Sequence, residues 1–569
     1  MLHLDRISSL GEALRDATVP NKTRLALIEA ERHRENGRWT YADLARDAER
    51  FAARLTARGL APGDKVAICM QNQARWLIAA TGAFWAGAVL VPIDYKLSAA
   101  EQRALVAHSD ARVVVAEPHT LRALAEQAPL SPDLLAFSVG PREAAPEGTI
   151  PWDDQADEGP FAFVPRTRDD VACIVYSSGT GGTPKGCMMT HGNYLAQAQS
   201  LSEVFDIDAG ARFFSVLPTN HAIDFMAGYV LSFLLGACVI HQRVLRPQYL
   251  ASTMKRYEVT HIALVPTILK NLERKLRERI DGLEGWARIG FDALLRANEV
   301  ATLKKPRPRL SRALLRPIHE AFGGHLEMIF AGGTFVDPKL ASFYYSLGIP
   351  VAIGYGLTEA GTVVAVNDLR PFRADTVGRP VPGTEVEIRD PGPDGVGEVW
   401  VRGPTVMKGY YKAPERTAEA LVDGWLRTGD LGYLDASGHL HLVGRAKNMI
   451  VTEGGKNVYP EDIEAHFEDL PGCEELCVFA RNYVWPRKTL VGETLVAVVH
   501  PEDGANPDAL RAALSAANRR LPDFKRLAGV VLVDEAFPRT ASMKVKRGEL
   551  AGRLRALDPN EAIHPLPVS

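Results

Sequence analysis

The chain has 569 residues, of which 46% are hydrophobic and 24% are charged. This balance is typical of globular domains, and it excludes a mainly disordered, collagen-like or disulfide-framework protein. Lys and Arg number 66 against 69 Asp and Glu, so the net charge of −3 gives the chain no overall attraction to nucleic acid. At roughly 150 residues per domain, the length predicts three or four compact units.

Three features predict where the protein works. The N-terminus, MLHLDRISSLGEALRDATVPNKTR, carries charges throughout and lacks the apolar core of a signal peptide. The longest uncharged run, 225–240, is shorter than the ~20 residues that span a bilayer, so we expect a buried helix there. The six cysteines stand in apolar surroundings, and we expect buried free thiols in a reducing compartment. These features predict a cytoplasmic protein.

Strand-like apolar runs alternate with helical patterns through most of the chain. The runs lie at 65–70, 88–92, 112–116, 170–176, 211–217 and 261–265. This β-α-β rhythm predicts an α/β fold with parallel sheets and helices on their faces. From about 384 to 444 the strands shorten and alternate with glycine turns, which predicts a small antiparallel β unit. We expect an N-terminal domain of residues 1–444 and an α+β C-terminal domain of residues 445–569.

One insertion, residues 269–317, is helical in pattern and strongly basic. It contains 13 Lys or Arg against 6 Asp or Glu. Such a segment could attract an anionic bilayer surface by about 1 kcal/mol per basic residue near the surface. A solvated charged face with no partner is the alternative. A peripheral position at the inner membrane face is therefore a prediction beside the cytoplasmic one.

The strongest motif is Tyr176-Ser-Ser-Gly-Thr-Gly-Gly-Thr-Pro-Lys-Gly186, directly after an apolar run. Glycines allow backbone N–H groups to surround an anion, hydroxyls add donors, and the lysine adds positive charge. The composition therefore predicts a phosphate-binding loop. The loop is not a Walker A motif, because proline precedes Lys185 and glycine follows it.

This loop resembles the signature of the adenylate-forming superfamily, which includes acyl-CoA synthetases, luciferases and peptide-synthetase adenylation domains. Six further motifs follow in the family's order, at 331–334, 354–359, 425–430, 444–450, 454–461 and 538–544. The resemblance covers about residues 35–550 and is greatest to bacterial long-chain fatty acid–CoA ligases. It implies two parallel-type α/β subdomains with a small β unit, followed by a smaller mobile C-terminal domain.

The resemblance also implies how the chain binds ATP. Activating a carboxylate builds negative charge on the phosphates, which requires cations, N–H donors and a metal. The glycine-rich loop is expected to hold the β- and γ-phosphates through Ser177, Ser178, Gly179, Thr180, Gly182, Thr183 and Lys185. Thr358 would contact the α-phosphate and Glu359 would bind Mg²⁺. The adenine and the acyl carboxylate would be bordered by Gly333, Thr334, Tyr355 and Gly356. Asp430 would accept both ribose hydroxyls, with Arg445 nearby.

The remaining implied roles concern the two half-reactions. Lys544 would bridge the carboxylate and the α-phosphate during adenylation, and His221 matches the histidine of the family's acyl pocket. The C-terminal domain would then swing about a hinge at Lys447. That movement would bring a CoA-binding loop, Gly454, Gly455 and Lys456, to the active site.

Three positions depart from the family pattern. Gly181 replaces a serine or threonine of the phosphate loop, so one hydroxyl is missing. Asn220 replaces an aromatic residue before His221, which affects how the CoA tunnel is gated. Met543 replaces the glycine that usually precedes the catalytic lysine. Similar endings occur among long-chain acyl-CoA synthetases, so we interpret Met543 as a mark of subclass.

These inferences predict an ATP-dependent ligase for medium- to long-chain fatty acids. The acid and ATP would give acyl-AMP and pyrophosphate, and CoA would then give acyl-CoA and AMP, with Mg²⁺ as the metal. Two alternatives are a fatty acyl-AMP ligase that loads an acyl carrier protein and an aryl-CoA ligase. A remote alternative from another class is an adenylate-binding regulatory pseudoenzyme. The expected partners are a fatty acid or other carboxylic acid, CoA or a carrier protein, and an anionic membrane at 269–317, but no nucleic acid.

Overall fold

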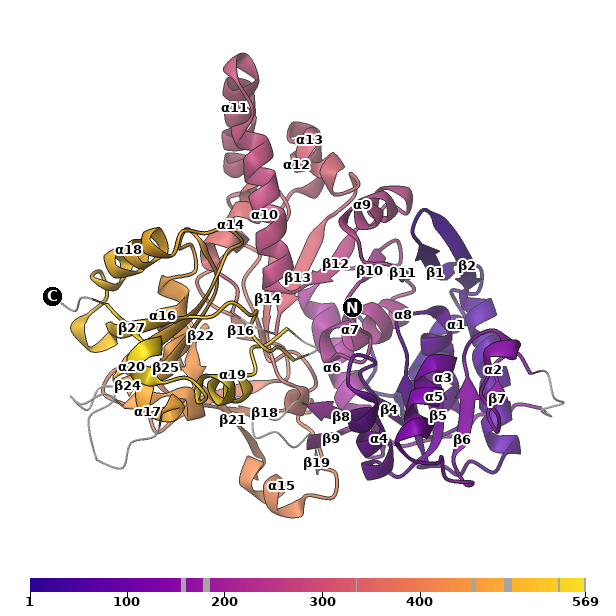
Figure 1. Ribbon diagram of the computed structural model, residues 1–569. Coiled ribbons are helices and arrows are strands. Elements are labelled where there is room, and N and C mark those ends of the chain that lie inside the picture. Colours follow the sequence, from indigo (N-terminus) through magenta and orange to yellow (C-terminus); the bar gives the residue numbers. More distant parts are fainter. Residues whose placement is uncertain are drawn as a thin grey trace. The chain divides into compact units, whose positions relative to one another are not determined.

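A computed structural model describes residues 1–154, 160–177, 185–333, 335–451, 457–485, 494–540 and 543–566 of the chain (Figure 1). These residues form two compact units. The first unit holds the described residues up to Val386 together with Val401–Leu426. The second holds Glu387–Trp400 and the described residues from Arg427 on. The predicted domain boundary at 444/445 and the hinge at Lys447 describe where the C-terminal domain is expected to rotate. Both stay predictions.

The first unit contains an eight-stranded sheet. Its strand order is β19 (Gly409–Tyr410), β9 (Lys185–Thr190), β8 (Val171–Ser177), β4 (Val89–Pro92), β3 (Lys65–Cys69), β5 (Ala111–Ala116), β6 (Leu135–Ser138) and β7 (Ile150–Pro151). The strands from β8 to β7 run parallel, as predicted. β9 turns back beside β8 and pairs with it antiparallel. The sheet is therefore mixed at the edge where the phosphate-loop motif lies.

A nine-stranded sheet forms the second layer of the same unit. Its order is β16 (Arg379–Pro380), β15 (Ala365–Val366), β14 (Val351–Tyr355), β13 (Met328–Gly332), β12 (His261–Leu264), β10 (Arg212–Ser215), β11 (Cys238–Gln242), β1 (Leu25–Glu31) and β2 (Arg34–Thr40). The central strands are parallel, and only the outer pairs at both edges are antiparallel. This is the predicted α/β architecture with mixed rather than purely parallel sheets.

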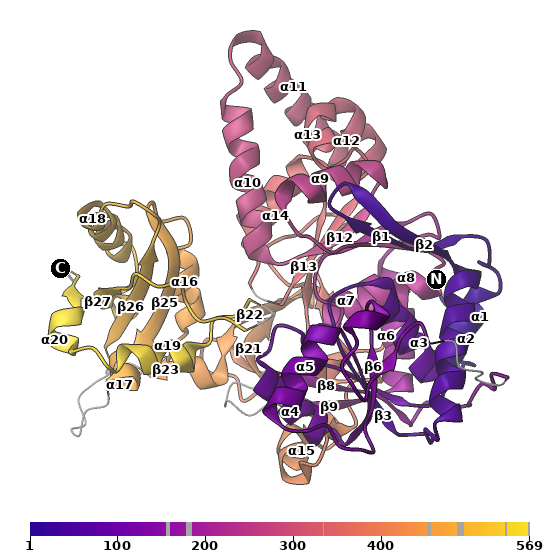
Figure 2. The same ribbon diagram turned by 45° about the vertical axis from the view of Figure 1, so that its right-hand side comes forward.

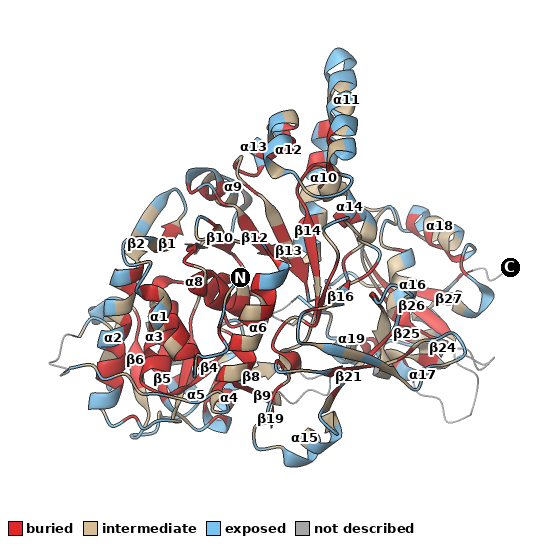
Figure 3. Ribbon diagram, turned by 180° about the vertical axis from the view of Figure 1, so that it is seen from behind, coloured by how far each residue is buried: buried red, intermediate tan, exposed pale blue. Residues whose placement is uncertain are grey.

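Helices alternate with the strands, as the β-α-β rhythm predicts. α2 (Tyr41–Ala57) begins at a capping box in which Thr40 and Asp43 each bond the other's backbone N–H. α3 (Ala74–Trp85) is almost wholly buried, in keeping with its apolar sequence (Figure 3). The other α-helices of at least seven residues among the described residues up to 260 are α1 (Leu10–Thr18), α4 (Ala99–His108), α5 (Pro118–Gln127), α6 (His191–Val204) and α9 (Pro247–Arg256).

The uncharged run 225–240 differs from the single helix predicted for it. It begins in a helical segment made of α7 (Ala222–Asp224), a π-helical stretch (Phe225–Leu231) and α8 (Ser232–Leu234). The run then enters the buried strand β11, because Cys238, Val239 and Ile240 pair with β1 and β10. In the part of the chain that the structure describes, no helix is long and apolar enough to cross a membrane.

The basic insertion is helical, as predicted. It forms α10 (Pro266–Asp281), α11 (Gly285–Thr302), α12 (Pro308–Leu314) and α13 (Arg316–Ala321). α10 and α11 run antiparallel and extend away from the nine-stranded sheet of the first unit (Figure 2). α14 (Pro338–Ser346) follows β13 and contacts the inner ends of both helices.

The predicted β unit is present as a five-stranded sheet at the point where the chain passes between the two units. Its strands are β17 (Glu385–Arg389), β18 (Gly397–Arg402), β20 (Leu421–Val422), β21 (Trp425–Leu434) and β22 (Leu440–Arg445), with α15 (Pro414–Ala420) before β20. β21 pairs antiparallel with both β20 and β22.

The second unit has the predicted α+β character. Its four-stranded sheet is formed by β25 (Cys473–Ala480), β26 (Leu495–Pro501), β27 (Leu527–Leu532) and β28 (His564–Pro565). Its helices are α16 (Pro460–His466), α17 (Arg481–Val484), α18 (Pro507–Asn518), α19 (Arg547–Leu554) and α20 (Pro559–Ala562). Two apolar clusters bury the residues of this sheet. The six cysteines are free thiols, and all but the half-buried Cys473 are buried, which largely confirms that prediction.

Candidate active site

Two adjacent strand ends of the first unit carry the glycines predicted to border the nucleotide. β13 and β14 are parallel, with Gly332 opposite Gly354, and Gly333 and Gly356 follow directly beyond the strands. Ligands of parallel sheets commonly bind at these carboxyl ends. A Cβ atom at Gly356 would lie 1.7 Å from the carbonyl oxygen of Thr362, so only glycine fits there. Tyr355 ends β14 and is buried.

Glu359, the predicted magnesium ligand, is fixed at both its backbone and its side chain. It lies in a short 3₁₀ turn, Thr358–Ala360, directly after the β14 motif. Its carbonyl oxygen accepts a hydrogen bond from the Met407 N–H over 2.8 Å. Its Oε1 accepts a hydrogen bond from the Tyr410 hydroxyl over 3.1 Å. The carboxylate is therefore held in place by a residue that is distant in sequence.

Tyr410 also contacts Lys185, the lysine of the phosphate loop. β19 pairs with β9 with Tyr410 opposite Cys187, and Lys185 Nζ lies 5.0 Å from the centroid of the Tyr410 ring. Burial and the Glu359 carboxylate both raise the pKa of the Tyr410 phenol. The phenol therefore stays protonated and can donate. One tyrosine thus connects the predicted phosphate cation with the predicted metal carboxylate.

A carboxylate and a small number of oxygen donors suit Mg²⁺, which often binds through one or two carboxylates together with substrate phosphates. Glu359 fits that pattern. Among the described residues, no group of three or more His, Cys, Asp or Glu side chains could hold a metal by itself. The carboxylate of Glu359 therefore fits a magnesium ion that is also held by substrate phosphates.

His221 lies beside Asp94, a residue that the sequence did not single out. His221 Nε2 lies 3.4 Å from Asp94 Oδ2. Burial alone would raise the pKa of Asp94. The opposing effects of His221 and of the Lys96 backbone N–H are larger together, so the pKa of Asp94 lies below its ordinary value. The carboxylate stays ionised and orients the imidazole of His221.

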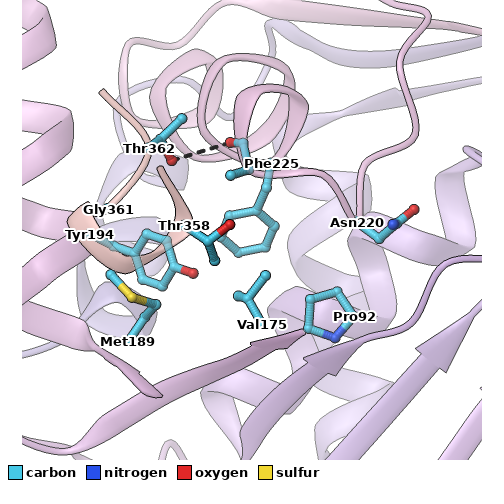
Figure 4. Close-up of a pocket in the computed structure, with 10 residues that line it drawn as sticks. Pro92, Val175, Met189, Tyr194, Asn220, Phe225, Thr358, Gly361 and Thr362 are labelled. Atoms are coloured by element: carbon cyan, nitrogen blue, oxygen red, sulfur yellow. Dashed lines mark hydrogen bonds between the residues drawn. The ribbon is translucent and has the colours of Figure 1, made fainter. Parts of the chain in front are cut away.

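A cavity in the first unit is lined by the chain neighbours of two of these residues, Thr358 beside Glu359 and Asn220 beside His221 (Figure 4). Its volume is about 270 Å³ including the space at its mouth. Its lining is largely apolar and comes from three strands of the eight-stranded sheet and from helical and connecting segments: Pro92, Val175, Met189, Tyr194, Asn220, Ala222, Phe225, Thr358, Gly361 and Thr362. Thr362 Oγ1 donates to the Ala222 carbonyl oxygen over 3.4 Å, which connects the turn after Glu359 with the start of α7. The cavity is therefore a candidate acyl site that reaches the predicted α-phosphate residue.

Asp430 and Arg445, the predicted ribose residues, lie opposite each other in the second unit. β21 and β22 pair them in register, and Arg445 Nε lies 2.5 Å from Asp430 Oδ1. Asp430 is buried, and its backbone N–H donates to Thr428 Oγ1 over 3.0 Å. The pair is therefore preformed.

Lys544, the predicted catalytic lysine, follows a turn of the second unit. Thr540 N donates to the Lys544 carbonyl oxygen over 2.7 Å, and Met543 N donates to the Thr540 carbonyl oxygen over 2.8 Å. Met543 has φ +65°, a left-handed conformation that favours glycine. Met543 therefore has a backbone conformation that suits the glycine expected at this position.

Several predicted site residues lie outside what the structure describes. Nothing is described for Ser178, Gly179, Thr180, Gly182, Thr183, Thr334, Gly454, Gly455 and Lys456, nor for the side chains of Ser177 and Lys447. Of the described ones, Lys185, His221, Gly333, Tyr355, Gly356, Thr358 and Glu359 belong to the first unit, and Asp430, Arg445 and Lys544 to the second. Within the first set, Gly333, Tyr355 and Gly356 lie at the neighbouring ends of β13 and β14, and Lys185 and Glu359 both contact Tyr410.

Sequence reasoning missed three residues that support the site. They are Asp94, Tyr410 and Arg539, each of which contacts or positions a predicted site residue. Arg539 stands within a recognised motif, 538–544. A Lys-Gly-Tyr-Tyr segment at 408–411 was the only local signal for Tyr410, and Asp94 follows an apolar strand with no motif around it.

Comparison with known proteins adds to this geometry. A family model described as AMP-binding enzyme matches residues 15–411. The chain is 31% identical over 522 residues to a feruloyl-CoA synthase of Amycolatopsis sp, an alignment that covers 90% of this chain and 94% of that protein. It is 29% identical over 464 residues to the long-chain-fatty-acid–CoA ligase FadD15 of Mycobacterium bovis, covering 75% and 73%. ATP-bound MatB from Rhodopseudomonas palustris superposes with a TM-score of 0.74 at 25% identity, covering 96% and 99%.

Proposed function

Because the chain belongs to the AMP-binding enzyme family, we propose that it is an ATP-dependent fatty acid–CoA ligase for medium- to long-chain acids. Its class is that of AMP-forming acid–thiol ligases. The single observation that carries the proposal is the contact of Tyr410 with both Glu359 and Lys185. A carboxylate for a metal and a cation for phosphate, held beside an apolar cavity, suit the transfer of adenylate to a carboxylic acid.

In the first half-reaction, a carboxylate oxygen of the acid attacks the α-phosphorus of ATP and pyrophosphate leaves. Lys185 would neutralise the departing phosphates, and Thr358 would donate to the α-phosphate. Glu359 would hold Mg²⁺, which supplies charge neutralisation on the phosphates when bound. Lys544 would bridge the two reacting groups, while Asp430 would orient the ribose. Removal of one such charge-stabilising group typically costs about 10²–10³ in rate.

In the second half-reaction, the thiol of CoA attacks the acyl carbonyl carbon and AMP leaves. His221 is oriented by the ionised Asp94. Its neighbour in the chain, Asn220, lines the cavity. We propose that this pair orders the acyl end for thiol attack. The loop at Gly454–Lys456 would approach after rotation about Lys447.

Two observations bear on the acyl group. The helical insertion and the similarity to FadD15 favour a fatty acid. The similarity to a feruloyl-CoA synthase over 90% of the chain favours an aryl acid. The lining of the cavity supports this second candidate, because two of its side chains, Tyr194 and Phe225, are aromatic.

The decisive experiment measures pyrophosphate release with ATP, Mg²⁺ and single acids from acetate to oleate, together with benzoate and ferulate, each with and without CoA. We expect turnover to peak with a medium or long chain and to yield acyl-CoA. A peak with ferulate or benzoate would establish the aryl-CoA ligase. Pyrophosphate release on long chains without acyl-CoA would indicate a carrier-protein acceptor. ATP binding with no pyrophosphate release on any acid would support the regulatory alternative.

A further inference from the structure

Helix α11 carries an apolar face that points to solvent. Its opposite side packs inward: Phe291 and Leu295 contact the core of the first unit, and Asn298 Nδ2 donates to the Ser346 carbonyl oxygen over 2.8 Å. The outer side presents Trp286 and Val300, which are 87% and 70% exposed. A surface helix normally shows the reverse arrangement, with apolar residues inward and charges outward.

The apolar residues of this outer face follow helical spacing. At 100° per residue, Trp286, Ile289, Ala293, Ala297 and Val300 share one stripe, and each is exposed. With a rise of about 1.5 Å per residue, the stripe is about 21 Å long. Figure 3 shows the exposed character of α11 along its length. A contiguous exposed apolar stripe of this kind marks an interaction surface.

Basic residues border the stripe at one end. The segment 285–316 contains eight Lys or Arg and two acids, and one of the acids, Asp292, lies 3.2 Å from Arg288 Nε in an ion pair. Lys304, Lys305, Arg307 and Arg309 follow α11 directly and are exposed. Leu303, 67% exposed, connects the stripe with this basic segment.

We propose that α11 is a docking surface for an anionic lipid bilayer, with the stripe in the interface and the basic segment 304–309 on the lipid headgroups. A helix with Trp and aliphatic side chains on one face and Lys or Arg at its border lies in the plane of such an interface. Long basic side chains can cover apolar surface while their charges reach the headgroups. The sequence predicted contact through 269–317 from charge alone. The structure adds the face and its apolar residues.

Charge decides between this occupant and a second copy of the chain. Two copies that met through α11 would bring the same excess of positive charge together, which opposes association. A bilayer with anionic headgroups complements that charge and accepts the apolar stripe. This inference goes beyond the proposed function, because docking requires neither ATP nor a particular acid.

The test is flotation of the full chain with vesicles of phosphatidylcholine alone or mixed two to one with phosphatidylglycerol. We expect binding to the mixed vesicles only, weakened by high salt because the charges are exposed. Exchange of Lys304 and Lys305 for Glu should lower the partition coefficient by about tenfold or more. A chain that does not float with the mixed vesicles overturns the proposal.

A variant of the stripe separates α11 from other surfaces. Trp286→Ser, Ile289→Ser and Val300→Ser together should reduce binding to mixed vesicles by at least tenfold. The matched control exchanges Val19 and Leu245, exposed apolar residues of the same unit that lie outside the insertion, for Ser and should bind as the wild type does. Equal binding by the stripe variant and the wild type would overturn the assignment to α11.

Two further readouts complete the test. The Trp emission of the wild type minus that of Trp286→Phe should shift to the blue on mixed vesicles, because an indole that enters the interface leaves water. Sedimentation velocity without lipid should give the same single species for the wild type and the stripe variant. A dimer that forms in the wild type and is lost in the variant would overturn the proposal, because the stripe would then bind a second copy of the chain. Pyrophosphate release with a water-soluble acid should be the same in both proteins, so a failed activity assay would not be confused with failed docking.

Discussion

Arg539 donates a hydrogen bond from Nη1 to the carbonyl oxygen of Met543 over 2.6 Å, one residue before Lys544. The same guanidinium is held by Glu475, with Nε 3.0 Å from Oε1. The other oxygen of Glu475 accepts from the Phe537 N–H over 2.6 Å. Glu475 therefore anchors both the start of the 538–544 motif and, through Arg539, the backbone that presents Lys544.

This anchor predicts that Arg539→Lys slows adenylation without removing a group that touches substrate. Lysine keeps the positive charge, but it lacks the planar guanidinium whose N–H groups donate to Glu475 and to the Met543 carbonyl oxygen at the same time. The loss of one charge-assisted hydrogen bond, about 1.5–3 kcal/mol, predicts a decrease of at least tenfold in pyrophosphate release. The CoA step from added acyl-AMP should be unchanged. Arg553→Lys, at an exposed pair with Glu535, is the control, and equal losses in both half-reactions would contradict a positioning role.

Met543 predicts a second, purely conformational effect. Its φ of +65° costs a non-glycine residue about 1–2 kcal/mol, and a β-branched residue suffers more. Met543→Gly should therefore keep adenylation and leave stability the same or higher, because relief of strain offsets the greater flexibility of unfolded glycine. Met543→Val should lower both. Thermal unfolding and pyrophosphate release measure the two effects, and a valine variant as active as the wild type would show that this backbone shape is dispensable.

Lys544→Ala should reduce adenylate formation by about 10²–10³, since a preorganised charge is lost where negative charge develops. Conversion of synthetic acyl-AMP and CoA to acyl-CoA should continue. Lys546→Ala is the matched control, because Lys546 lies two residues on and pairs with Glu549 at 3.4 Å on the surface. A near-normal rate of pyrophosphate release in the Lys544 variant would remove this lysine from the mechanism.

The fold could be predicted largely because local patterns and tertiary structure agree. The capping box at Thr40 and Asp43 and the apolar runs that became β3, β4 and β5 are local signals. The composition of the run 225–240 alone predicts one helix, because buried strands and buried helices share the same composition. Only pairing with β1 and β10 decides that its end, from Cys238, is a strand.

Site residues that stand in a contiguous sequence motif could be predicted. Those that reach the site only through long-range contacts could not. Glu359 and Lys185 stand in such motifs. Tyr410, which contacts both, is brought to them by the pairing of β19 with β9, and no spacing in the sequence encodes that pairing. Asp94 reaches His221 in the same way, from the end of a different strand.

His241 predicts a loss of stability in mild acid. The side chain is fully buried in β11, and neither ring nitrogen has a hydrogen-bond partner among the described residues. Burial lowers its pKa to about 3, below the ordinary value of 6.5. Between these two pH values, His241 binds a proton in the unfolded chain but not in the folded one. The stabilisation that the neutral His241 gives is therefore fully present above pH 6.5 and decreases as the pH falls.

The measurement is the urea midpoint at pH 7.5 and at pH 5. The wild type should lose on the order of 1–2 kcal/mol from this group at pH 5. His241→Leu should show a smaller difference between the two pH values, since leucine has no charge to acquire. His33→Leu is a control from the same unit, at an exposed turn. An unchanged pH dependence in the His241 variant would assign the acid sensitivity to other groups.

Tyr410→Phe tests the connection between the metal carboxylate and the phosphate lysine. The variant keeps the ring that faces Lys185 and removes only the hydroxyl that donates to Glu359. A hydrogen bond to a charged group contributes about 1.5–3 kcal/mol, so the Mg²⁺ concentration for half-maximal pyrophosphate release should rise by about tenfold or more. The neighbouring Tyr411→Phe provides the control, because its hydroxyl donates to Asp110 over 2.8 Å at the surface. If both variants keep the wild-type magnesium dependence, Glu359 does not need Tyr410 to hold the ion, and Tyr410 would serve only to pack β19 against β9.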